Sequence, residues 1–148
     1  MIISTRGRYA LRVMIDLAEC GGGEYTAMKK IAERQGISLK YLERILPILT
    51  QNGIVEGVQG KGGGYRLTRS PSEYKVGEIL RLTEGDLAPV VCLQSGADEC
   101  ERAGVCRTLP MWKNLQKVIT DYLDGVTLAD LVNSDTEPKK NDCTENKQ

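Results

Sequence analysis

The spacing of apolar residues along the chain predicts a series of short amphipathic helices. Apolar side chains recur at intervals of three and four residues, as they do on one face of a helix. The predicted helices lie between residues 4 and 21, at 27–34, between 38 and 52, at 76–83 and from 110 to about 123, with one more turn at 127–131. Ser4, Thr26 and Ser38 precede the first three, where a hydroxyl can cap free backbone amides. Pro47 falls inside the third helix, where we expect a kink or an early weakening.

After residue 53, apolar and polar residues alternate with a period of two in place of the helical spacing. Residues 54–59 alternate like a strand, 60–64 form a glycine-rich tip, and 65–68 predict a returning strand. The two preceding helices are joined by a turn at Gly36, which is the arrangement of a helix-turn-helix, and a hairpin directly after it is a wing. The expected fold is mainly α with a small β-hairpin: a winged helix-turn-helix followed by a long dimerisation helix.

The last long helix carries an apolar stripe that needs a partner surface. Its members are Trp112, Leu115, Ile119 and Tyr122. Because the winged unit has its own core, we expect this stripe to pack on the same helix of a second chain, and two-fold symmetry would then match two half-sites on DNA. The expected parts are a winged DNA-binding domain (1–84), a cysteine-containing loop (85–106), a dimerisation region (107–132) and a disordered tail (133–148).

Composition and charge favour a cytoplasmic protein with a phosphate-binding front half. The chain has 148 residues, of which 41% are hydrophobic. No apolar run approaches the roughly 18 residues of a membrane span, and the N-terminus lacks the apolar block of a signal peptide. Residues 1–84 hold 13 Lys and Arg against 9 Asp and Glu, whereas residues 85–148 hold 7 against 11. The zero net charge therefore hides a basic front and an acidic back.

Three segments of the front half carry side chains suited to a DNA duplex. The candidates in the recognition helix are Ser38, Lys40, Tyr41, Glu43 and Arg44. Those at the chain start are Ser4, Thr5, Arg6 and Arg8, and those in the wing are Gln59, Lys61 and Arg66. The basic members can meet phosphates or guanine, whereas Glu43 can accept from cytosine and repels the backbone. The alternative is a solvated charged face with a flexible hairpin. A basic chain start, a helix-turn-helix and a glycine wing in this order favour DNA binding over that alternative.

Five cysteines and no histidine restrict the chemistry of any metal site. Three of the cysteines cluster as Cys92-x7-Cys100-x5-Cys106. Thiolates suit iron–sulfur clusters, zinc and copper(I), but structural zinc sites usually pair ligands two to four residues apart, so this spacing disfavours a zinc knuckle. An odd number of cysteines in a cytoplasmic chain favours ligation or redox sensing over disulfides. We expect Cys20 and Cys143 to be bystanders.

Two other functions stay open on the residues alone. Reducible thiols can sense oxidation without a metal. An electron carrier or redox enzyme would need an electron partner or a substrate pocket, and the chain shows no nucleotide fingerprint, no histidine and no nucleophile–base pair. We therefore do not expect an enzyme.

Three signatures together resemble one known family. They are Ser4-Thr5-Arg6-Gly7-Arg8-Tyr9-Ala10-Leu11, Ile37-Ser38-x-x-Tyr41-Leu42-Glu43 and Gly60-x-Gly62-Gly63-Gly64-Tyr65. From Met1 to about Leu131 the chain is similar to the iron–sulfur cluster regulators (IscR) among bacterial winged-helix proteins. The resemblance implies a homodimer formed through the late helix, palindromic promoter DNA near cluster-assembly genes, and an iron–sulfur cluster, 2Fe–2S in preference to 4Fe–4S. Cys92, Cys100 and Cys106 would bind it.

The chain departs from this family at three positions. Gln59 stands where the family often has a wing arginine, so Lys61 could take over that contact. The family's ligand histidine corresponds to Leu109, and the aspartate used by its nitric-oxide-sensing branch corresponds to Arg8; neither can bind the metal. The remaining candidates for a fourth ligand are Asp86, Asp98, Glu99, Glu101 or an acidic residue from elsewhere such as Glu43, including one from the other subunit.

Overall fold

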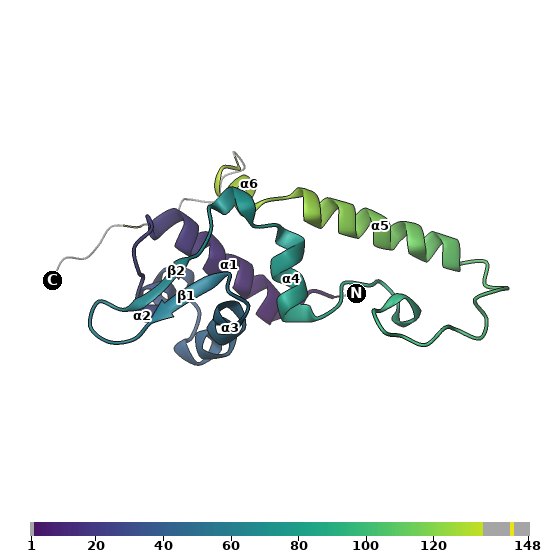
Figure 1. The fold of residues 1–148 in the computed structure, drawn as a ribbon, viewed down its shortest axis with the longest axis horizontal. Helices are drawn as coiled ribbons and strands as arrows, with labels where there is room; N and C mark the ends of the chain where they lie inside the picture. The colour runs from purple at the N-terminus through teal and green to yellow at the C-terminus, as the bar shows by residue number, and fades with distance from the viewer. Residues whose placement is uncertain (1, 135–142, 144–148) are drawn as a thin grey trace.

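A computed structural model describes residues 2–134 and Cys143, and it has the mainly helical fold with a hairpin wing that the sequence predicts (Figure 1). The α-helices are α1 (Thr5–Cys20), α2 (Met28–Gln35), α3 (Leu39–Gln51), α4 (Val76–Glu84), α5 (Leu109–Gly125) and α6 (Leu128–Val132). The strands are β1 (Val55–Val58) and β2 (Gly64–Leu67), and two 3-10 turns are η1 (Pro71–Glu73) and η2 (Val91–Leu93). No helix among the described residues is long and apolar enough to cross a membrane.

Two of the three predicted helix caps are confirmed. The hydroxyl of Ser4 accepts a hydrogen bond from the Gly7 amide at 3.2 Å, and that of Ser38 accepts one from the Tyr41 amide at 3.2 Å. The prediction for Thr26 is wrong, because α2 begins after Ala27 and has no side-chain cap. Thr26 instead exchanges two backbone hydrogen bonds of 2.8 Å with Tyr65, so its segment serves as an extra edge of the wing.

The wing hairpin needs a glycine where it meets this extra edge. Strands β1 and β2 are antiparallel, with Val55 opposite Leu67. A β-carbon on Gly64 would lie 2.2 Å from the carbonyl oxygen of Thr26, and the φ of Gly64 is +149°. Only glycine has no β-carbon to clash and readily adopts this positive φ, so the close approach of Thr26 explains why the wing has a glycine at this position.

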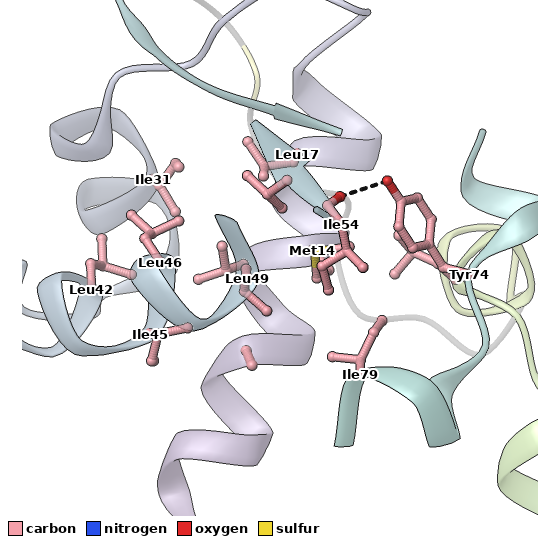
Figure 2. Packing of buried hydrophobic residues seen from close by; sticks show 14 of the residues in the cluster. Met14, Leu17, Ile31, Leu42, Ile45, Leu46, Leu49, Ile54, Tyr74 and Ile79 are labelled. Carbon is pink, nitrogen blue, oxygen red and sulfur yellow. Dashed lines mark hydrogen bonds between the residues drawn. The ribbon is translucent and has the colours of Figure 1, made fainter. Parts of the chain in front are cut away.

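The core of the winged unit gathers apolar side chains from α1, α2, α3, β1 and α4 (Figure 2). Its fully buried members include Met14, Ile31, Leu42, Ile45, Leu46, Leu49 and Ile79. Tyr74 is also buried, and its hydroxyl donates to the Ile54 carbonyl at 2.7 Å while it accepts from the amides of Thr68 and Arg69. This cluster gives the winged unit an apolar core of its own, as expected from the sequence.

Helix α3 is continuous through Pro47, whereas a kink or weakening was expected there. Proline removes one hydrogen bond from a helix and costs about 3 kcal/mol. The same helix buries Leu42, Ile45, Leu46 and Leu49, and each fully buried aliphatic side chain contributes about 1.5–3 kcal/mol. Tertiary burial therefore outweighs the local cost.

A buried ion pair joins α1 to α2. The carboxylate of Asp16, which is fully buried, accepts two hydrogen bonds from the guanidinium of Arg34, at 2.9 and 2.7 Å. Gln35 donates a third at 3.1 Å, and the hydrogen bond to Asp16 raises the pKa of Arg34. With its oxygens satisfied in this way, the carboxylate fixes the position of α2, the first helix of the helix-turn-helix.

The segment after α4 leaves the winged unit and then returns to it. In Figure 1 it runs outward through η2, turns, and comes back along α5. The return is fixed by backbone hydrogen bonds from Val76 to Val126 (2.9 Å) and from Leu128 to Tyr74 (3.0 Å). Leu128 of α6 is fully buried in the same core as α1 and α3. We refer to residues 85–125 below as the excursion.

The sequence argued against disulfides, and that expectation is wrong for Cys20 and Cys143, whereas their interpretation as bystanders to the metal site stays a prediction. The two residues form a disulfide with a Cα–Cα distance of 5.3 Å across 123 positions of sequence. Helix α6 packs against α1, so the chain beyond it can reach the C-terminal end of α1, where Cys20 lies. No local sequence signal reports such a long-range pairing. Of the predicted disordered tail (133–148), the structure describes 133, 134 and Cys143, and the rest lies outside the described residues.

Candidate nucleic-acid interface and cysteine loop

The N-terminal end of α3 is exposed and well anchored. Lys40, Glu43 and Arg44 are exposed on its first turns, beside Ser38, which is occupied as the cap. The half-buried ring of Tyr41 meets that of Tyr9 from α1 edge to face, with 5.3 Å between centroids. Such contacts leave the charged side chains free while the helix backbone is held against α1.

The first turn of α1 places a second set of the predicted residues beside α3. Arg6 and Arg8 are exposed, and the Arg8 guanidinium donates to the Thr5 hydroxyl at 3.1 Å. Helices α1 and α3 pack directly on each other. In Figure 1, α3 lies along the lower edge, between the wing tip and the N-terminal end of α1. The three predicted DNA-binding segments therefore occupy one edge of the winged unit in this view.

The wing contains both exposed and engaged side chains. Gln59 and Lys61 are exposed near its tip. Arg66 lies at its base, where its guanidinium forms an ion pair with Glu56 and stacks over the ring of Tyr25 at 4.5 Å. The Tyr25 hydroxyl donates a hydrogen bond to the Glu56 carboxylate at 2.7 Å. The hydrogen bonds from Tyr25 and Arg66 lower the pKa of Glu56. Arg66 is thus already occupied in holding the wing against the loop before α2.

The cysteine loop presents three thiols outside any disulfide. Cys92 in η2 and Cys100 are exposed, and Cys106 is half-buried just before α5. The Cys106 sulfur lies 3.4 Å from the Thr108 hydroxyl. That hydrogen bond, with the backbone amides of Thr108 and Leu109 and the charge of Arg102, lowers the pKa of Cys106. Cys106 is therefore the thiol best prepared to be a thiolate.

The structure does not bring the candidate ligands together. Among the described residues, no three His, Cys, Asp or Glu side chains are placed to hold a metal ion. Of the candidates for a fourth ligand, Asp98, Glu99, Glu101 and Glu43 are exposed. Both carboxylate oxygens of Asp86 are engaged, because one accepts a hydrogen bond from the Ala88 amide at 2.6 Å and the other accepts one from the Ser95 amide at 2.7 Å. The bond from Ser95, and after it the bond from Ala88, lowers the pKa of Asp86. The three thiols are suitable ligands for an iron–sulfur cluster, but the loop would have to rearrange to bring them together around one.

An open hollow lies beside the first cysteine of the loop. It has a volume of about 540 Å³ and is lined by Val91, Cys92 and residues 94–98. Asp98 shares this hollow with Cys92, which keeps that carboxylate among the candidates. No sequence signal indicates that Asp86 organises the loop by accepting backbone hydrogen bonds, because neither Ala88 nor Ser95 belongs to a recognisable motif.

The apolar stripe predicted on the last long helix is divided in two. Leu115 and Tyr122 lie on the exposed side with Met111 and Val118, where their exposed fractions run from 40% to 69%. Trp112 and Ile119 are half-buried on the side facing inward, as is Leu123, which packs against the second apolar cluster beside α4. The helix has no fully buried residue. The surface that lacks a partner is therefore 111, 115, 118 and 122, which we call the exposed seam.

Comparison with known proteins decides the family of this fold. A family model described as Rrf2, an iron-dependent transcriptional regulator, matches residues 3–134. The chain belongs to the Rrf2 family. The HTH-type transcriptional regulator IscR of Pectobacterium carotovorum is 37% identical over 134 residues, which are 90% of this chain and 80% of that protein. IscR of Escherichia coli is 36% identical over the same length, with 82% of that protein covered.

Solved structures of Rrf2 regulators show the same arrangement. CymR, the global cysteine regulator of B. subtilis, matches with a TM-score of 0.73 and 34% identity, over 89% of this chain and 96% of that one. IscR of T. potens matches with a TM-score of 0.69 and 36% identity, over 89% and 86% of the two chains. These proteins are regulators and not enzymes. The chain is an IscR-like transcriptional regulator of the Rrf2 family, in agreement with the resemblance seen in the sequence.

Proposed function

We propose that the protein is a homodimeric regulator that binds palindromic promoter DNA and whose affinity depends on an iron–sulfur cluster, with cluster-assembly genes as its targets. The observation that carries the proposal is a trio of thiols outside any disulfide, in a loop that leads directly from α4 of the winged unit to the unpartnered helix α5. Cys92, Cys100 and Cys106 would hold the cluster, which supplies an oxidisable, readily lost prosthetic group when bound. We favour 2Fe–2S over 4Fe–4S.

DNA binding rests on the exposed basic residues along one edge of the winged unit. Lys40 and Arg44 would meet guanine or phosphate in the major groove, while Thr5, Arg6, Arg8, Ser38 and Tyr41 contact the DNA backbone. Ser4 would support them by capping the start of α1. Lys61 and Gln59 would reach the minor groove from the wing tip. Arg66 contributes by fixing the base of the wing. Glu43 would disfavour sites that lack a cytosine partner.

Dimerisation rests on the exposed seam of α5. Its four residues follow a spacing of four, three and four, which is the pattern of a coiled-coil contact. Trp112 and Ile119, which are half-buried beside the exposed seam, would form the border of the dimer interface. A second copy would remove these side chains from water and place two recognition helices on two half-sites.

Protein purified without oxygen tests the cluster and the switch together. We expect coloured material with iron and sulfide, and the Cys92→Ala, Cys100→Ala, Cys106→Ala triple variant should be colourless. The control is Cys20→Ala with Cys143→Ala, which removes the two cysteines outside the loop without leaving a new free thiol and should keep the colour. Fluorescence anisotropy on a promoter fragment should then give different affinities for loaded and cluster-free protein. Equal affinities at every site would contradict the switch.

Sedimentation and DNA titration test the two surfaces separately. Tyr122→Asp should shift the protein from dimer to monomer at micromolar concentration, because it buries a charge in an apolar interface. Lys40→Ala with Arg44→Ala should weaken DNA binding by tenfold or more at physiological salt. Lys113→Ala, an exposed cation on α5, is the control and should leave DNA affinity unchanged.

A metal-free thiol sensor is the second candidate, and the state of Cys106 favours it. The Thr108 hydrogen bond lowers the pKa of Cys106, which raises the thiolate fraction of that side chain. Metal analysis separates the two: anaerobic protein that lacks both iron and sulfide, yet loses DNA affinity on mild oxidation, would favour the thiol sensor.

A further inference from the structure

The last residue of α4 closes onto the first turn of α1. The carboxylate of Glu84 accepts a hydrogen bond from the Ser4 hydroxyl at 2.6 Å and one from the Ser4 amide at 3.3 Å. The same hydroxyl accepts from the Gly7 amide as the cap of α1. Ser4 thus donates to Glu84 and accepts from the helix it caps, which links a residue 80 positions away to the start of α1.

Gly7 makes this approach possible. It is buried, and a β-carbon built on it would lie 2.2 Å from the nearer oxygen of Glu84. Any other residue at this position would push the carboxylate away from the start of α1. The glycine of the first sequence signature is therefore explained by the space that Glu84 occupies.

Glu84 also stands at the beginning of the cysteine loop. Gly85 follows it with a φ of +80°, and the next residue, Asp86, binds the loop amides of Ala88 and Ser95. One turn earlier, Arg81 forms two hydrogen bonds to Asp124 of α5, at 2.8 and 3.0 Å. The last turn of α4 is therefore in contact with the start of α1, the cysteine loop and α5.

We propose that Glu84 is the positioning residue that transmits the state of the cysteine loop to the DNA-contacting first turn of α1. A rearrangement of the loop moves its first residues, and these are separated from Glu84 by a single glycine. Withdrawal of the carboxylate would release the Ser4 hydroxyl and loosen the turn that carries Thr5, Arg6 and Arg8. The carboxylate also lies at the positive end of α1, where a negative charge stabilises a helix. The inference rests on the proposed function, because it assumes that the loop has two states.

The test compares cluster-loaded with cluster-free protein in the wild type and in three variants. Glu84→Ala removes both hydrogen bonds to Ser4, whereas Glu84→Gln keeps an acceptor oxygen without the charge. Glu33→Gln removes the same charge from an exposed position of α2, far from the loop, and is the matched control. The measured quantity is the ratio of the two dissociation constants on one promoter fragment. Circular dichroism at the assay temperature verifies that each variant is folded.

We expect the wild-type ratio to fall within the range of about 5 to 150 that is typical of coupled sites. In Glu84→Ala the ratio should fall to about one, with Glu84→Gln intermediate and Glu33→Gln equal to wild type. A Glu84→Ala protein that keeps the wild-type ratio overturns the role of Glu84 and leaves the switch intact. A wild-type ratio of one, or wild-type protein without iron, overturns the proposed switch and the coupling together.

Hydrogen exchange provides a readout that does not depend on DNA. In the wild type, the amides of Gly7 and Arg8 should exchange at different rates in loaded and cluster-free protein, because the Ser4 cap is tighter in one of them. In Glu84→Gln, which is the variant less disturbed in folding, the difference should shrink by severalfold. An unchanged difference would contradict the proposal even if Glu84→Ala does not fold.

Discussion

The winged unit and the excursion differ in what holds them in place. In the winged unit, buried side chains from six elements form one core, and two polar groups within it, the Asp16 carboxylate and the Tyr74 hydroxyl, are hydrogen-bonded. The excursion has a long helix without one fully buried residue, and a loop held by a few hydrogen bonds to Asp86. A region built in this second way is incomplete alone, which leaves room for a cofactor and a second chain to decide its shape.

The largest expected difference comes from removing the same side chain in each region. Leu49→Ala opens a hole in the packed core and should lower the free energy of unfolding by about 2–5 kcal/mol. Leu115→Ala, at a side chain that is 40% exposed, should cost less than about 1 kcal/mol in dilute, monomeric protein. Urea denaturation of both variants measures the two values. Equal losses would show that the exposed side of α5 has an intramolecular partner.

The buried ion pair should respond almost as strongly. Asp16→Ala leaves the guanidinium of Arg34, which is 17% exposed, without its carboxylate, and the expected loss of unfolding free energy is about 3 kcal/mol. The control is Asp121→Ala, which breaks an exposed pair with Lys117 on the excursion and should change stability by no more than about 0.5 kcal/mol. Denaturant midpoints compare them, and a small loss for Asp16→Ala would mean that α2 is held by apolar contacts alone.

A hydroxyl deletion gives a finer comparison between the two regions. Tyr74→Phe removes one donor and acceptor from the core, leaving the Ile54 carbonyl and the Thr68 and Arg69 amides without it, at a cost of about 1–3 kcal/mol. Tyr122→Phe changes an exposed ring on α5 in the same way and should be neutral. Thermal unfolding monitored by circular dichroism is sufficient, and a neutral Tyr74→Phe would argue against a buried hydrogen-bond network.

The smallest effect is a dependence on pH where the two regions meet. The hydrogen bonds from Arg81 lower the pKa of Asp124 from its ordinary value of 3.8. A lowered pKa in the folded state contributes stability above the unfolded value and loses it as the pH falls through the folded one. Asp124→Asn should therefore flatten the stability profile below about pH 4, by a fraction of 1 kcal/mol because the pair is about 40% exposed. Urea unfolding between pH 2.5 and 6 would detect it, and an unchanged profile would show that the pair does not brace α4 against α5.

The sequence predicted what depends on local spacing. The helices, the wing and the caps at Ser4 and Ser38 follow from periodicity and from hydroxyl residues at helix starts, and the structure confirms them. Thr26 looked like the third cap, but its backbone is used by β2, and no single-segment pattern reports that competition. The disulfide between Cys20 and Cys143 was missed for the same reason, because its partners lie 123 positions apart in the sequence.

The candidate site was predictable as a set of residue types and less so as an arrangement. Three thiols and a row of basic residues are visible in the sequence. The sequence does not show which of these side chains already have partners. Such contacts depend on neighbours outside the local segment, as in the bonds of Arg66 to Glu56, of Asp86 to the Ser95 amide and of Glu84 to Ser4. The stripe on α5 shows the same limit, because helical spacing alone could not tell which half of it faces α4.

The backbone pairing of residues 74–76 with 126–128 has a mechanical consequence. The pairing fixes the return of the chain beside the start of α4, whereas the chain departs after the end of α4, so residues 85–125 leave and return at opposite ends of one helix. Lengthening or shortening such an appendage changes loop-closure entropy only slowly. Evolution, or a protein engineer, could therefore replace the excursion by another segment while the winged unit stays folded.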